Sequence, residues 1–145
     1  NLRRFGLTFL VTDDSQSLTA NELAIVSQLP ELLDPDDVVL ADPWMGGSLA
    51  YVLTGVTTLP RHLTSYDATS PALEVLMDSL DDVSVDPEVC PALEELGVDY
   101  VLDFKGRTIL DGPRAAGLSD IRPRDGFEPI LMIGDSTLYH ITACA

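Results

Sequence analysis

The 145-residue chain has little positive charge, few cysteines and no long apolar run. Eight Lys and Arg residues stand against 24 Asp and Glu residues, which gives a formal net charge of −16 at pH 7. Such a surface repels nucleic acids and anionic lipid headgroups, so we expect no nucleic-acid partner. The longest apolar runs hold about five residues, far fewer than the roughly 20 that a membrane-spanning helix needs.

Patterns for metals and cofactors are also missing. Acidic clusters occur at 34–37 and 81–88, but the spacing of a calcium-binding loop is absent, so a solvated acidic face is the simpler interpretation. Cys90 and Cys144 fit no zinc pattern. They can form one disulfide in an oxidising compartment or remain two separate buried thiols, and composition alone leaves both open. We therefore expect neither a metal nor a cofactor.

Length and composition predict one folded domain. A chain of this size builds a single hydrophobic core, and a hydrophobic fraction of 46% is ordinary for a globular protein. Residues 1–17 are mixed in character, and we expect them to lead in from a preceding segment. The chain starts at Asn1 without a visible signal sequence, so we expect it to be a piece of a longer protein. Residues 18–145 then form the domain.

Alternating helix and strand patterns predict an α/β fold. A capping box at Thr19–Glu22 starts a helix through about Leu33, in which Pro30 should cause a kink or an early end. Further helical patterns occur at 48–54, which is apolar nearly all round and should be buried, at 70–80, and from about 87 or 91 to 96. Strand patterns occur at 38–41, 57–59, 98–104, 130–133 and 138–142. The order predicts a three-layer, Rossmann-like domain with a mixed sheet and a C-terminal β-hairpin.

The most informative stretch is a strand–loop–helix unit over residues 38–55. Its loop follows the carboxyl end of a strand, where open α/β sheets bind ligands, and it contains the only Trp of the chain. If the first strands are parallel, the loop at 61–67 and the segment after Phe104 gather at the same edge. We therefore expect one shallow substrate-binding depression, lined by Asp42, Trp44, Gly46, Gly47, His62 and Asp67.

Recognition of hydroxyl groups is the chemistry expected of this depression. The N–H groups of Gly46 and Gly47 should be open at a helix start, which favours anionic or hydroxyl partners. Trp44 could stack on a sugar ring while carboxylate and imidazole groups supply hydrogen bonds. A polyanion would be repelled by the overall charge, so a carbohydrate fits best.

Two serine motifs are typical of hydrolases, and both have simpler interpretations. Ser48, Asp103 and His140 follow the chain order of an α/β-hydrolase triad, but Ser48 lies too far from the strand end for a nucleophile elbow. Gly134–Ser136 resembles the first block of the SGNH esterases, yet too little chain follows it for their second block. A hairpin turn explains it better.

Three segments together resemble one known family. They are Asp42-Pro43-Trp44-x-Gly46-x-Ser48-x-Ala50-Tyr51, Leu59-Pro60-x-His62-Leu63 and Cys90-x-x-Leu93-x-x-Leu96-Gly97-Val98-x-Tyr100-Val101-Leu102-Asp103-Phe104. The family comprises large multi-pass membrane proteins of actinobacteria, of unassigned function, with a carboxy-terminal domain on the outer face of the membrane. The resemblance covers roughly residues 18–143. Lys105 departs from it, because a glycine often follows the Asp-Phe pair.

The resemblance implies an extracytoplasmic domain of a membrane protein. The membrane part of the family is similar to the C superfamily of glycosyltransferases, which use polyprenyl-phosphate-linked sugars. This chain would then be an accessory domain that positions a lipid-linked sugar or glycan acceptor beside the transmembrane part of its own protein, with the catalytic carboxylates outside this chain. The outer-face location also implies a disulfide between Cys90 and Cys144. A non-catalytic cell-surface assembly or sensing domain stays open as the alternative.

Overall fold

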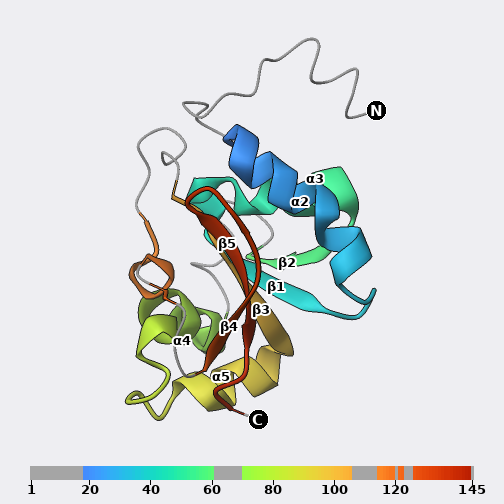
Figure 1. The fold of residues 1–145 in the computed structure, drawn as a ribbon. Coiled ribbons are helices and arrows are strands. Elements are labelled where there is room, and N and C mark those ends of the chain that lie inside the picture. Colours follow the sequence, from blue (N-terminus) through green and yellow to red (C-terminus); the bar gives the residue numbers. More distant parts are fainter. Residues whose placement is uncertain (1–17, 61–69, 106–113, 120, 123–125, 145) are drawn as a thin grey trace.

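A five-stranded mixed sheet forms the centre of the computed structural model, which describes residues 18–60, 70–105, 114–119, 121–122 and 126–144 (Figure 1). The strands are β1 (Val38–Ala41), β2 (Thr57–Leu59), β3 (Val98–Asp103), β4 (Phe127–Ile133) and β5 (Ser136–Ile141). Their order is β2-β1-β3-β5-β4. The first three are parallel, and β5 runs antiparallel to both β3 and β4. The mixed sheet and the C-terminal hairpin are confirmed.

Helices cover both faces of the sheet, which gives the three predicted layers (Figure 1). The helices are α2 (Ala20–Leu32), α3 (Gly47–Thr54), α4 (Pro71–Ser79) and α5 (Val89–Leu96), and the short 3-10 turns are η1 (Pro43–Met45), η3 (Leu80–Asp82) and η5 (Ala116–Leu118). Successive strand residues point to opposite faces. In β1, Val39 packs into the core under α2, whereas Leu40 packs into the core under α4 and α5. No helix in the described part of the chain is long and apolar enough to cross a bilayer.

The first helix starts as predicted, and its last turn extends to Leu32, close to the expected end at about Leu33. The Thr19 hydroxyl accepts a hydrogen bond from the Glu22 N–H, and the Glu22 carboxylate accepts one from the Thr19 N–H. The helix continues through Pro30 to Leu32 instead of ending there. Pro30 removes one N–H donor, but the Leu33 N–H still reaches the Leu29 carbonyl at 2.9 Å and holds the last turn.

Two further expectations need correction. Helix α3 is not buried all round: Ala50 is fully buried, but Tyr51 is 44% exposed and Val52 is 73% exposed. This helix lies in an outer layer, so only one of its faces meets the rest of the molecule. Strand β4 starts at Phe127 rather than at residue 130 and runs through Pro129. That proline is tolerated because β4 is an edge strand.

A disulfide joins Cys90, in the first turn of α5, to Cys144, just beyond β5. The two Cα atoms are 5.6 Å apart. The bond ties the helical layer to the end of the last strand. It confirms the pairing that the family resemblance implied.

Replacing both cysteines, Cys90→Ala with Cys144→Ala, should lower the free energy of unfolding by about 4 kcal/mol, the chain-entropy value for a loop of this length. Urea denaturation measures it. Mass spectrometry of the non-reduced, alkylated protein serves as the companion test, and two freely alkylated cysteines in the folded protein would contradict the bond.

Thr58 generates a second prediction. Its side chain is fully buried in β2, and its hydroxyl has no hydrogen-bond partner among the residues that the structure describes. Thr58→Val removes this hydroxyl at nearly constant shape, so the protein should become about 1 kcal/mol more stable. Thr54→Val is the matched control, because the Thr54 hydroxyl bonds to the Ala50 carbonyl and the Val56 N–H. The control should lose stability, and a loss in both variants would contradict the assignment.

Candidate functional site

The carboxyl ends of β1 and β3 form a topological switch point. The chain runs from β1 outward to β2 and returns to β3 on the other side of β1, with the helices α3 and α4–α5 on opposite faces. Ligands of open α/β sheets bind outside the carboxyl ends of the strands at such a point. Asp42 directly follows β1, Asp103 ends β3, and both carboxylates are buried.

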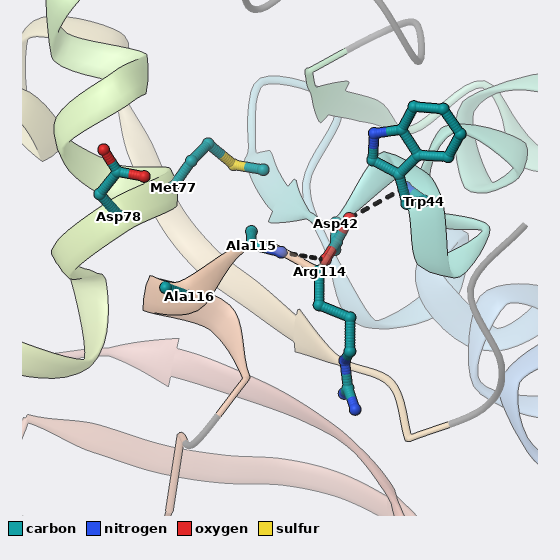
Figure 2. A pocket seen from close by; sticks show the side chains of 7 residues that line it. All are labelled: Asp42, Trp44, Met77, Asp78, Arg114, Ala115 and Ala116. Carbon is teal, nitrogen blue, oxygen red and sulfur yellow. Dashed lines mark hydrogen bonds between the residues drawn. The ribbon is translucent and has the colours of Figure 1, made fainter. Parts of the chain in front are cut away.

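Asp42 connects parts of the chain that are far apart in sequence. Its Oδ1 accepts a hydrogen bond from the Trp44 N–H at 2.9 Å and caps η1, while its Oδ2 accepts one from the Ala115 N–H at 2.7 Å (Figure 2). Both carboxylate oxygens are therefore engaged by backbone. Asp42 fixes the turn that carries Trp44 and attaches the segment 114–119 to the end of β1.

Burial raises the pKa of Asp42 above its ordinary value, although the hydrogen bonds from Ala115 and Trp44 and the charge of Arg114 act in the opposite direction. The folded protein thus holds this proton to a higher pH than the unfolded chain does. The contribution of Asp42 to stability consequently falls as the pH rises through the folded-state pKa.

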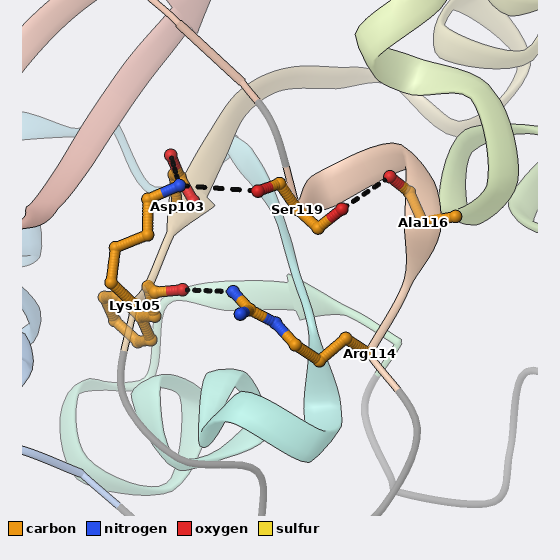
Figure 3. A network of polar contacts seen from close by, with 6 residues as sticks. Asp103, Lys105, Arg114, Ala116 and Ser119 are labelled. Carbon is orange, nitrogen blue, oxygen red and sulfur yellow. Dashed lines mark hydrogen bonds and ion pairs between the residues drawn. The ribbon is translucent and has the colours of Figure 1, made fainter.

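Both ends of the segment 114–119 are also tied to the residues that directly follow β3 (Figure 3). The Lys105 ammonium pairs with the Asp103 carboxylate at 3.0 Å and donates to the Ser119 carbonyl at 3.4 Å. The Arg114 guanidinium donates to the Phe104 carbonyl at 3.2 Å. The segment therefore lies across the carboxyl ends of β1 and β3 and occupies part of the crevice at the switch point.

Gly117 allows this segment to pack closely against α4. A Cβ atom at Gly117 would lie 2.6 Å from the Ser79 backbone nitrogen and 2.7 Å from both the Leu76 carbonyl oxygen and the Leu80 backbone nitrogen. Such distances are closer than real Cβ contacts, so a side chain here would push η5 away from the helix. The glycine thereby lets η5 approach α4 and close one side of the crevice.

A depression of about 250 Å³ remains open beside the segment (Figure 2). Its lining residues come from β1 and η1, from α4 and from the segment itself: Asp42, Trp44, Met77, Asp78, Arg114, Ala115 and Ala116. Trp44 is half-buried and Asp78 is exposed. An aromatic, an acidic and a basic residue therefore contribute to the wall of one small hollow, and the Arg114 guanidinium is directed to the Phe104 carbonyl.

The predicted site residues are only partly brought together. Asp42 and Trp44 line the depression. Gly46 and Gly47 are buried, and their N–H groups donate to the Pro43 carbonyl and the Asp42 carbonyl, so these amides are not open as expected. A Cβ atom at Gly47 would lie 2.5 Å from the Ala41 Cβ, which shows that this glycine serves close packing. His62 and Asp67 lie outside the described residues.

The segment after Phe104 was expected at this edge, but its lining residues Arg114, Ala115 and Ala116 were not named, and the lining by α4 was not expected. Asp78 lies on an amphipathic helix, and Arg114 lies in a stretch that shows only loop character. The position of this segment after a strand was one signal, and Lys105, the single lysine of the chain, which follows a strongly predicted strand, was another.

The arrangement assembles neither a hydrolase triad nor a metal centre in the part of the chain that the structure covers. In the sheet His140 pairs with Tyr100, whereas Asp103 pairs with Thr137. Asp103 and His140 are therefore three strand residues, about 10 Å, apart along the sheet. Ser136 is buried at the end of the β4–β5 turn. No group of three Asp, Glu, His or Cys side chains in the described ranges is placed to hold a metal ion.

The sequence comparison identifies the family. Residues 1–143 match the sequence profile of DUF6541, a family of unknown function. The chain belongs to this family. No curated protein and no solved structure matches the chain.

Asp42→Asn tests the bridge between β1 and the segment 114–119. An asparagine has one acceptor oxygen and places its NH₂ group against one of the two backbone N–H donors, so the free energy of unfolding should fall by about 1–3 kcal/mol. Asp78→Asn is the control, because that exposed carboxylate lines the same depression. Equal stability of the two variants in denaturant titrations would contradict the bridging role.

Proposed function

We propose that this chain is the extracytoplasmic domain of an actinobacterial multi-pass membrane protein, and that it positions a glycan acceptor or a lipid-linked sugar for a glycosyltransferase-like membrane part. The observation that carries the proposal is the half-buried Trp44 on the wall of the depression at the switch point. The transmembrane part of the same protein would be the partner. The reacting groups would belong to that part.

The chemistry of the depression suits a neutral, hydroxyl-rich ligand. An indole ring offers a flat apolar face on which a sugar ring can stack. Asp78 is exposed and can accept hydrogen bonds from hydroxyl groups, and the guanidinium of Arg114 can donate them. A ligand with many negative charges would be repelled by the net charge of −16.

The disulfide supports the extracytoplasmic location. Disulfides persist in oxidising compartments and are rare in the cytosol of most organisms. The bond between Cys90 and Cys144 joins two elements of the domain and is therefore part of the folded structure. A domain on the outer face of a membrane would meet the conditions under which this bond forms.

The second candidate is a non-catalytic assembly or sensing domain at the cell surface. The observation that favours it is the edge strand β4, where Ile130 is 41% exposed and Met132 is 58% exposed. An edge strand with apolar side chains can pair with a partner protein. The sequence of the whole protein separates the two: membrane spans with an acidic pair in the first outer loop favour the transferase, and spans without such carboxylates favour assembly.

Trp44 is the only tryptophan of the chain, so its fluorescence reports directly on the proposed site. Titration with neutral oligosaccharides and with a water-soluble, short-chain polyprenyl-phosphate sugar should shift its emission in a saturable manner. Asp78→Ala should weaken this binding about tenfold, because it removes a charged hydrogen-bond acceptor.

Glu74→Ala is the matched control, since Glu74 is an exposed acidic residue of the same helix and does not line the depression. This variant should bind like the unchanged protein. An emission spectrum that no sugar alters would refute the proposed function. So would equal weakening in the two variants.

A further inference from the structure

A larger groove, of about 660 Å³, lies at the opposite end of the central strands, where β3 begins and β5 ends. One wall is α5 with its disulfide, and the other is formed by the strand ends. Leu93 and Ile141 are buried and form part of an apolar lining, together with the bonded Cys90 and Cys144. The volume lies within the range of pockets that bind ligands.

An aromatic pair lies next to this groove, and one of its two members, His140, lines it. Tyr100 and His140 are opposite residues on the antiparallel strands β3 and β5, with ring centroids 5.0 Å apart and an angle of 30° between the ring planes. Both side chains are half-buried; His140 lines the groove, whereas Tyr100 packs against the core under α2.

A bulge directs a carboxylate to the same place. Val38 pairs with Val98 and Val39 pairs with Tyr100, so Asp99 is the extra residue on β3. Bulges of this kind re-aim a side chain. Asp99 is exposed and lines the groove, as does the exposed Glu94 of α5.

More negative charge surrounds the aromatic pair. Burial raises the pKa of Tyr100, and the charges of Asp37, Asp99 and Asp34 raise it further, so three carboxylates act on this phenol. Among the described residues that line the groove, none is Lys or Arg. At the carboxyl end of β3, Lys105 pairs with Asp103 and Arg114 bonds to the Phe104 carbonyl, far from this groove. The local potential is therefore negative and uncompensated by the lining.

We propose that this groove binds an extended basic segment of a partner protein, in which Arg or Lys side chains alternate with apolar ones. The cationic groups would pair with Glu94 and Asp99, and the apolar side chains would cover Leu93 and Ile141. A membrane surface fits less well, because anionic headgroups are repelled by this charge. The groove shares no lining residue with the Asp42–Trp44 depression, which lies at the other end of the strands.

Binding of the acetylated and amidated peptide Arg-Leu-Arg-Leu-Arg to the 145-residue protein tests the proposal. Isothermal titration calorimetry should show saturable binding. In NMR spectra, amide chemical shifts should change mainly at the start of β3, at the end of β5 and in α5. The double variant Glu94→Gln with Asp99→Asn should weaken binding about tenfold. The peptide Arg-Gly-Arg-Gly-Arg, which has the same charge without the apolar side chains, should bind several-fold more weakly.

Glu74→Gln with Asp82→Asn is the matched control, because it removes the same two kinds of exposed charge from α4 and η3 and touches neither pocket. It should change the affinity less than twofold. Equal weakening in both double variants would show general attraction to an acidic surface and would overturn the proposal. Absence of peptide binding would overturn it as well, and so would equally tight binding of spermidine, which indicates a small-cation site. Asp99→Asn alone repeats the test if the double variant fails to fold.

Discussion

The carboxylate of Asp42 is the interaction on which the candidate site depends. One of its oxygens fixes the η1 turn that carries Trp44, and the other binds the backbone of Ala115, 73 residues further along the chain. Without the second bond, the segment 114–119 would lose its attachment to β1, although Lys105 and Arg114 would still tie it to β3. The shape of the depression therefore follows from one buried carboxylate that accepts two hydrogen bonds.

This carboxylate also explains why the crevice at the switch point is only partly open. Folding has to bury a charge there, and two backbone N–H groups offset the cost that burial alone would impose. One of these two donors, the Ala115 N–H, belongs to the segment 114–119. The η5 turn of this segment approaches α4 closely because residue 117 is glycine. What remains beside the segment is a small hollow with Trp44 on its wall, which suits a single sugar unit better than a large cofactor.

Local patterns in the sequence predicted most of the fold. The capping box at Thr19, the glycine after α5 and the alternation in β3 each act within a few residues, so their outcome is visible in sequence. Long-range contacts are different. The contact between Asp42 and Ala115, the tie from Lys105 to Ser119 and the lining role of Asp78 depend on how distant segments meet. The expected open amides of Gly46 and Gly47 were wrong for the same reason, because neighbouring carbonyls in the folded turn accept both.

The two edges of the sheet differ in chemistry, with a small aromatic and polar hollow at one end and a larger acidic groove at the other. The assignment of the first edge depends on the bond between Asp42 and Ala115. Native-state hydrogen exchange of the Ala115 amide, followed by NMR, tests this bond most directly. The account predicts that this amide, although it lies outside any helix or strand, exchanges far more slowly than a solvent-exposed amide. Exchange at the rate of an unprotected peptide would contradict it.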